Sequence, residues 1–191
     1  MNRIGLLGGT FNPIHIGHLT MAQIALERLR LKKVIFIPSN LPPHKIVKGL
    51  VPALHRYAMV RLAIQGYPHF EVSDVEVKRK GKSYSIDTIK YFHSILSART
   101  KLYFIIGEDA LARLHTWKEF KKIQKLVSFI VVNRPGYKHR AAKSKYHFVN
   151  MPEIDIASSF LRNRIAERKS IKYFVPERVY RYIKRHQLYQ Y

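Results

Sequence analysis

Four short apolar runs constrain the fold of this chain more than any other feature. They cover residues 4–7, 34–37, 102–106 and 127–132. Each run is too short for a helix, and none alternates strictly between apolar and polar residues as a half-exposed strand would. Such runs are typical of strands that are buried on both faces of a parallel sheet.

Helical patterns lie between these runs. Apolar residues recur at steps of three and four over residues 19–29, and Leu54, Ala58 and Leu62 repeat the pattern. Strands that alternate with helices predict an α/β fold with a doubly wound parallel sheet. Because no internal repeat or linker interrupts the chain, we expect a single domain over residues 1–191.

Several residues mark where helices are expected to begin. Ser85 is a candidate N-cap for a helix over residues 86–99, and Ser158 precedes a second helix over residues 160–168. Pro176 stands where proline is tolerated, in the first turn of a terminal helix. Residues 138–145 are polar and follow an Arg-Pro-Gly sequence, which predicts a loop.

The composition favours some partners and excludes several kinds of site. The chain has 35 Lys and Arg against 12 Asp and Glu, a net charge of +23 that favours polyanions such as nucleotides, nucleic acid or lipid surfaces. Because this charge is spread along the chain, we expect mostly solvated surface and no specific nucleic-acid partner. The absence of cysteine excludes disulfides and thiolate metal sites.

The hydropathy pattern predicts a cytoplasmic protein with no membrane partner. No uninterrupted apolar run approaches the roughly 18 residues that a membrane helix needs. The N-terminus lacks the pattern of a signal peptide.

Two glycines and two histidines follow the first apolar run. Ligands of open parallel sheets bind beyond the carboxyl ends of the strands, and Gly8 and Gly9 would let the backbone approach a ligand closely. A helix that opens near His18 would offer free N–H groups to phosphate, and His15 is close enough in sequence to reach the same anion. A metal site is less favoured, because the nearest acidic residue is Glu27.

This glycine segment matches neither the dinucleotide-binding Gly-x-Gly-x-x-Gly pattern nor the Gly-Lys-Ser/Thr phosphate loop. Hydride transfer and hydrolysis of a γ-phosphate therefore lose support. The segment predicts a phosphate-binding turn of another kind.

Residues 9–18, Gly-Thr-Phe-Asn-Pro-Ile-His-Ile-Gly-His, resemble the signature of the nucleotidyltransferase superfamily. Residues 157–162, Ala-Ser-Ser-Phe-Leu-Arg, are similar to the family's second ATP element, Ile-Ser-Ser-x-x-Ile-Arg. The resemblance implies a Rossmann-like fold with three α/β/α layers, and a triphosphate of ATP held between the two elements. The implied catalytic residues are His15 and His18, with His18 favoured. The implied ATP-binding residues are Gly8, Gly9, Thr10, Phe11, His15, His18, Ser158, Ser159 and Arg162.

Segments in the middle of the chain resemble bacterial nicotinate-nucleotide adenylyltransferases in particular. These segments are residues 42–45, 84–88 and 105–117, together with residues 171–176 before the terminal helix. The resemblance implies adenylyl transfer from ATP to nicotinate mononucleotide, giving deamido-NAD and pyrophosphate, with Mg2+ carried by ATP. The implied mononucleotide-binding residues are His44, Lys45, Ser85, Asp109 and Trp117.

Other interpretations remain open at this point. Phosphopantetheine adenylyltransferase belongs to the same superfamily but usually has Thr in place of His15. Residues 15–18 also match the His-Ile-Gly-His motif of class I aminoacyl-tRNA synthetases, although the chain lacks their lysine-rich second motif. A non-catalytic nucleic-acid-binding module would explain the charge, but no aromatic RNP element or zinc finger is present. Homo-oligomerisation and the preference for nicotinate over nicotinamide are not fixed by the sequence.

The chain departs from the family pattern at two positions. Asn12 stands where the family often has Asp, and we expect its side chain to bond to neighbouring backbone and stabilise the turn. Phe160 stands where the family often has Thr. We therefore expect Ser158 and Ser159 to supply the hydroxyls of that element.

Overall fold

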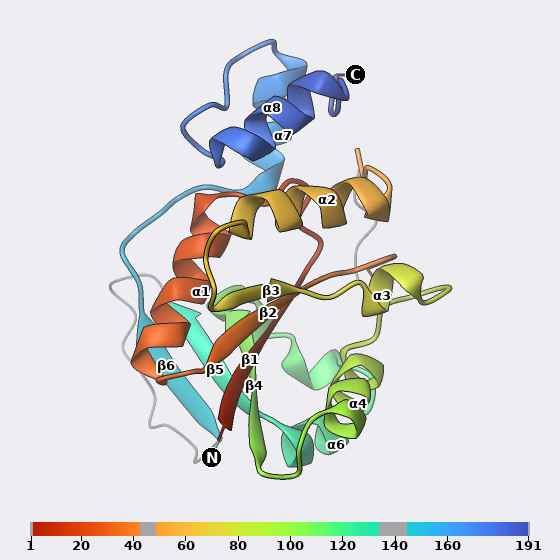
Figure 1. Cartoon of the computed structure of the whole chain (residues 1–191), viewed down its shortest axis with the longest axis vertical. Coiled ribbons are helices and arrows are strands. Elements are labelled where there is room, and N and C mark those ends of the chain that lie inside the picture. Colours follow the sequence, from red (N-terminus) through yellow and green to blue (C-terminus); the bar gives the residue numbers. More distant parts are fainter. Residues whose placement is uncertain (1, 43–48, 134–144, 191) are drawn as a thin grey trace.

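The computed structural model describes residues 2–42, 49–133 and 145–190, which contain a six-stranded parallel sheet (Figure 1). The strand order is β3-β2-β1-β4-β5-β6, and every neighbouring pair is parallel. The strands are β1 (Asn2–Gly9), β2 (Lys33–Pro38), β3 (Phe70–Val72), β4 (Thr100–Gly107), β5 (Ser128–Asn133) and β6 (Tyr146–Asn150). The predicted apolar runs form the four central strands, which confirms the α/β fold.

The two edge strands carry no comparable sequence signal. In β3 no residue is fully buried, and in β6 only Val149 is. Because an edge strand packs incompletely, it does not need the continuous apolar run of a strand buried on both faces. These two strands were therefore not predicted.

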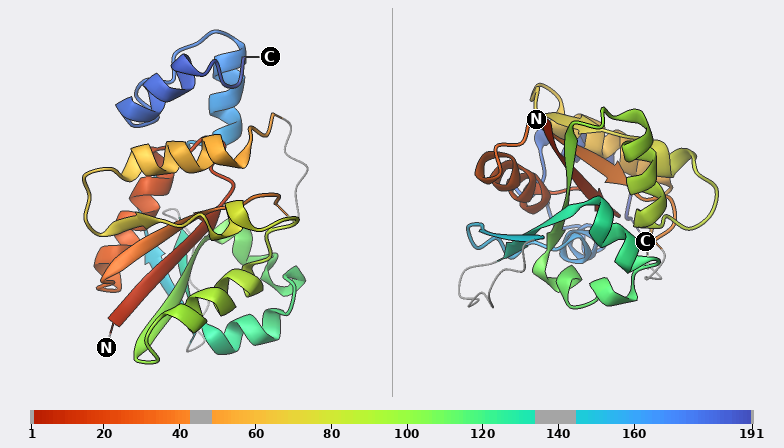
Figure 2. Two further views of the ribbon diagram at one scale, coloured as in Figure 1. Left: turned by 45° about the vertical axis from the view of Figure 1, so that its right-hand side comes forward. Right: turned by 90° about the horizontal axis from the view of Figure 1, so that it is seen from below.

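Helices cover both faces of the sheet and make three α/β/α layers (Figure 2). One face carries α1 (Ile16–Arg28) and α2 (Ala53–Ile64), and the other carries α4 (Ser85–Ile95) and α6 (Phe120–Leu126). Beyond α2, away from the sheet, lie α7 (Ser158–Ala166) and α8 (Glu177–Arg185), and α8 packs against α2. Short helices α3 (Val75–Lys78) and α5 (Glu108–Leu111) and the turn Leu114–Thr116 complete the set. Successive strand residues alternate between the two cores, since Leu6 packs in one and Leu7 in the other. The Rossmann-like architecture is thereby confirmed.

The helix boundaries differ from the predicted ones by a few residues. Ser85 is the first residue of α4, with Tyr84 as its N-cap, and the helix ends at Ile95. Helix α7 begins at Ser158 itself. Residues 138–144 of the predicted loop lie outside the described residues.

The second helix is present as predicted, and Leu62 of its predicted stripe packs partly buried against the core, but the prediction is wrong at Leu54. Leu54 is 72% exposed, and α2 instead turns Arg56, Met59, Val60 and Ile64 inward. One of these buried positions is an arginine, which the apolar pattern could not include. Within the described ranges no helix has the length and apolar character needed to cross a bilayer.

Candidate functional site

The turn between β1 and α1 is shaped by an aromatic ring packed against a glycine. Phe11 is buried, has a left-handed backbone (φ 46°), and packs edge-on to the His18 ring at a centroid distance of 5.1 Å. A Cβ atom at Gly9 would lie 2.8 Å from the Phe11 ring, so a side chain there would displace it. The Phe11 side chain thus belongs to the core, and only its backbone is available to a ligand.

His15 and His18 face each other at the start of α1. Their ring centroids are 3.8 Å apart, and the backbone N–H of His15 donates to Nδ1 of His18 at 3.3 Å. Nδ1 of His18 is therefore an acceptor, and this network assigns the proton of the neutral ring to Nε2. Among the described residues, no group bonds to the buried Nδ1 of His15.

Both imidazoles are held in the neutral form. Burial lowers the pKa of His15 to about 4. Burial also lowers the pKa of His18 well below its usual value, and the nearby charge of a protonated His15 lowers it further. At neutral pH the pair consequently presents hydrogen-bonding rings with no net charge.

The start of α7 lies against this turn. Ser158 Oγ donates to the carbonyl of Pro13 at 2.9 Å, and Arg162 Nη1 donates to the carbonyl of Asn12 at 2.9 Å. Ser159 is exposed beside them. The structure thus brings the two sequence elements of the expected phosphate site together from opposite ends of the chain.

Asn12 joins two distant parts of the chain to this turn. Its Nδ2 donates to the carbonyl of Gly49 at 2.9 Å, and its Oδ1 accepts from the Val51 N–H and the Tyr189 hydroxyl. The side chain does bond to backbone, as expected, but the partners are far away in sequence. The amide both donates and accepts here, which a carboxylate could not do.

Arg56 is a buried residue of the site that the sequence did not reveal. It is 1% exposed, and it donates from Nη1 to Thr10 O at 2.8 Å, from Nη2 to Asn40 O at 2.8 Å and from Nε to Val51 O at 3.0 Å. Burial lowers the pKa of Arg56 to about 10, so the guanidinium stays charged at neutral pH. Because C=O and N–H of a trans peptide point in opposite directions, a fixed Thr10 carbonyl also fixes the Phe11 N–H.

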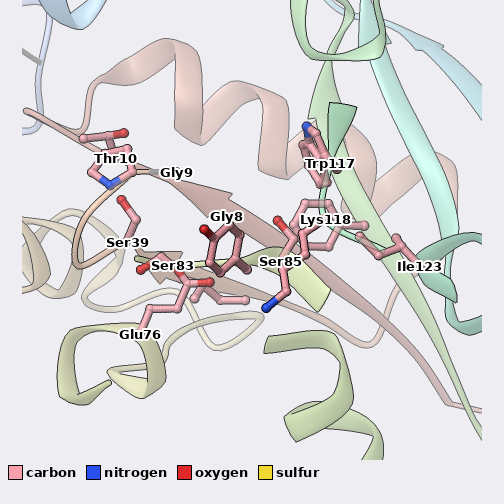
Figure 3. Close-up of a pocket in the computed structure, with 14 residues that line it drawn as sticks. Gly8, Gly9, Thr10, Ser39, Glu76, Ser83, Ser85, Trp117, Lys118 and Ile123 are labelled. Carbon is pink, nitrogen blue, oxygen red and sulfur yellow. The ribbon is translucent and has the colours of Figure 1, made fainter. Parts of the chain in front are cut away.

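Two cavities meet at the end of β1. The larger one, about 450 Å³, is lined by His18 and Asp109 among others, and the smaller one, about 160 Å³, includes Ser85 (Figure 3). They share four lining residues, which are Gly8, Gly9, Phe104 and Trp117. Asp109 and Ser85, expected to contact the same mononucleotide, line different cavities, with Trp117 common to both.

The smaller cavity contains polar groups that the sequence did not reveal. Ser39 and Lys118 line it, and so does the buried carboxyl of Glu76, which accepts from Thr88 Oγ1 at 2.6 Å. Thr10, which the family resemblance assigned to ATP, also lines this cavity. Burial raises the pKa of Glu76, while hydrogen bonds from Thr88 and Ser83 act against this shift. The predicted residues His44 and Lys45 lie outside the described residues.

Phe160 takes part in packing around the same turn. Its ring meets the Phe174 ring edge-on at 5.5 Å, and the Arg164 guanidinium lies over both rings. The carbonyl of Phe174 accepts from the N–H of Ile16 at the start of α1. Phe160 therefore packs α7 against the segment that contacts α1, and it leaves Ser158 and Ser159 as the hydroxyls of that helix start.

The described residues contain no group of three His, Asp or Glu side chains that could hold a metal ion.

A parallel α/β sheet whose first strand ends in a glycine turn at a helix start defines a nucleotide-binding class of protein. Residues 6–164 match the cytidylyltransferase-like family. A probable nicotinate-nucleotide adenylyltransferase of Thermoanaerobacter sp. is 40% identical, over 98% of this chain and 94% of that protein. Another from Listeria welshimeri is 43% identical, over 98% and 97%. The chain belongs to the cytidylyltransferase-like family and, within it, to the nicotinate-nucleotide adenylyltransferases.

A solved structure supports the same fold. The nicotinic acid mononucleotide adenylyltransferase of Plasmodium falciparum, complexed with NaAD, superposes with a TM-score of 0.83. The two sequences are 20% identical, and the aligned region covers 99% of this chain and 98% of the Plasmodium chain. This likeness confirms the fold, and the sequence relatives confirm the family that the motifs predicted.

Proposed function

We propose that this enzyme transfers the adenylyl group of ATP to nicotinate mononucleotide, giving deamido-NAD and pyrophosphate. The observation that carries the proposal is the pair of cavities that meet at Gly8 and Gly9. One cavity adjoins the histidine pair and the other adjoins the start of α4 at Ser85. In adenylyl transfer the phosphate of one substrate attacks the α-phosphorus of the other, so the two binding sites must adjoin.

In this proposal the larger cavity accepts ATP. The triphosphate lies at the turn, with His15 and His18 on one side and Ser158, Ser159 and Arg162 on the other. The backbone N–H groups of residues 8–11 add further donors. Asp109 lines the larger cavity, where its carboxylate suits ribose hydroxyls.

The smaller cavity accepts the pyridine ring of the mononucleotide. Trp117 offers an aromatic face, and Ser85 offers its hydroxyl and the N–H groups of the start of α4 to the ring carboxylate. We further expect His44 and Lys45 to meet the phosphate of the mononucleotide. The reaction joins this phosphate to the α-phosphorus of ATP.

The chemistry needs positioned donors and no general base. A phosphate monoester has a second pKa of about 6, so the attacking oxygen is already ionised at neutral pH. The protein must align two anions and stabilise charge on the transferring group and on the leaving pyrophosphate. Neutral histidines with a low pKa suit this role, because each can donate an N–H without acting as a base, and a triphosphate nearby would raise the pKa of both. Magnesium, arriving with ATP, would neutralise phosphate charge and keep most of its waters.

A single assay tests the proposal. The protein is incubated with ATP, magnesium and, in parallel, nicotinate mononucleotide, nicotinamide mononucleotide or phosphopantetheine, and pyrophosphate and dinucleotide are measured. We expect the highest kcat/KM with nicotinate mononucleotide. Product with phosphopantetheine alone, or with none of the three, would overturn the assignment.

A further inference from the structure

The smaller cavity contains an ammonium group to which no role has yet been given. Lys118 follows Trp117 directly and lines this cavity, where both residues lie on the same side as Ser85 (Figure 3). Its Nζ lies 4.6 Å from the centroid of the Tyr84 ring. A cation held against an aromatic face is oriented without being neutralised.

The acid next to Lys118 in the sequence is paired with other lysines and not with Lys118. Glu119 forms ion pairs with Lys122 and Lys90. In the part of the chain that the structure describes, Lys118 takes part in no ion pair. Its charge therefore remains available to an anion in the cavity.

The surroundings of Lys118 favour an anion at one particular place. Tyr84, which the ammonium contacts, is the N-cap of α4, and Ser85 is the first residue of that helix. The positive end of an eleven-residue helix and the ammonium thus lie on the same side of the cavity. The acid of the cavity, Glu76, already accepts from Thr88 and Ser83, so its carboxyl is committed to other donors.

We propose that Lys118 is a specificity-determining residue whose ammonium pairs with the ring carboxylate of the acceptor, so that nicotinate mononucleotide is preferred over nicotinamide mononucleotide. This inference rests on the proposed function. The two acceptors share a phosphate, a ribose and a ring, and they differ only in a charged carboxylate against a neutral carboxamide. A charge-assisted hydrogen bond is stronger than a neutral one, so an ammonium at this point binds the carboxylate of nicotinate more tightly than the carboxamide of nicotinamide.

The test compares the two acceptors in four proteins. We measure kcat/KM for nicotinate and nicotinamide mononucleotide in the wild type, Lys118→Met, Lys118→Arg and the matched control Lys121→Met, an exposed lysine of α6 outside the cavity. In Lys118→Met the ratio of the two values should fall by roughly tenfold or more, the scale for losing a hydrogen bond to a charged group. Lys118→Arg should retain most of the ratio, and Lys121→Met all of it.

A binding measurement separates this inference from the proposed function. Trp117 is the only tryptophan, so its fluorescence reports occupation of the cavity without turnover. Tighter binding of nicotinate than of nicotinamide mononucleotide in the wild type, lost in Lys118→Met, supports the inference. If Lys118→Met weakens the binding of both mononucleotides equally, the ammonium contacts the phosphate that they share. If the ratio of the two affinities is unchanged, Lys118 takes no part in recognition. Either result overturns the inference. Failure of the proposed function looks different, because the wild type itself would then form no dinucleotide.

Discussion

The turn after β1 and the smaller cavity hold their polar groups in different ways. At the turn, Asn12 and Arg56 are each 1% exposed and bond to backbone from distant parts of the chain. In the smaller cavity, Ser85 lies at a helix start and Lys118 is an exposed side chain held against one ring. Under the proposed function, the fold as a whole sets the position of the phosphates, whereas recognition of the acceptor depends on side chains that can be replaced one at a time.

The largest effect should come from breaking the buried network of the turn. In Arg56→Met the carbonyls of Thr10, Asn40 and Val51 lose their donor inside the protein. We expect the free energy of unfolding to fall by about 3 kcal/mol or more, since each unsatisfied buried acceptor costs roughly 1–3 kcal/mol. Urea denaturation measures this loss, and turnover should fall with it.

Arg61→Met on the same helix is the matched control for Arg56. Arg61 is exposed, so its replacement should change stability by less than about 0.5 kcal/mol. Equal stabilities of the two variants would contradict a special role for the buried guanidinium.

The next effect concerns the donor to the triphosphate. We expect His18→Ala to lower kcat by at least about a hundredfold, the scale for losing a donor to the transition state. His18→Gln, which keeps an N–H donor, should retain part of the activity. Steady-state kinetics with both substrates saturating provide the measurement. Turnover close to that of the wild type in His18→Ala would remove His18 from the mechanism.

A third effect follows from the low pKa of the histidine pair. The unfolded chain takes up a proton at His15 near pH 6.5, whereas the folded protein resists protonation down to about pH 4. Stability should therefore fall as the pH drops from about 6.5 towards 4, by on the order of 3 kcal/mol for this group.

Chemical denaturation at a series of pH values measures this dependence. His18 acts in the same direction, since its pKa is also lowered. In His15→Gln the slope of stability against pH should be shallower than in the wild type. Parallel slopes would show that His15 does not resist protonation in the folded protein.

The smallest effect should appear on the acceptor side. Ser85→Ala should reduce kcat/KM for nicotinate mononucleotide by about threefold to tenfold, the scale of one hydrogen bond. Because the N-cap of α4 is Tyr84 and not Ser85, the free energy of unfolding should hardly change. A large loss of stability in Ser85→Ala would contradict the difference between the turn after β1, whose polar groups stabilise the fold, and the smaller cavity, whose side chains can be replaced one at a time.

The sequence predicted those parts of the molecule whose signal is local. The central strands were identifiable because burial on both faces requires continuous apolar runs. The proximity of His15 and His18 was expected from their spacing of three residues, and their ring centroids lie 3.8 Å apart. The meeting of Ser158 and Arg162 with the turn was expected from the family resemblance, and the structure brings these residues together.

Residues whose role depends on distant contacts were not predictable in this way. The partners of Arg56 are backbone carbonyl groups, which every residue type has, so the sequence at those positions does not indicate the contact. One signal was present, because Arg56 falls in helical register with the apolar residues Met59, Val60 and Ile64. An arginine on the buried face of a helix could have indicated a charge satisfied by the backbone. Lys118 gave no comparable signal among the many surface lysines.

The shared wall of the two cavities has a kinetic consequence. Gly8, Gly9, Phe104 and Trp117 line both cavities, so under the proposed function the dinucleotide would occupy both at once. In the proposed reaction each reactant occupies one cavity, but the product must leave as one longer molecule that gives up both sets of contacts. We therefore expect departure of the dinucleotide to limit the steady-state rate, and rapid mixing should then show a burst of pyrophosphate in the first turnover.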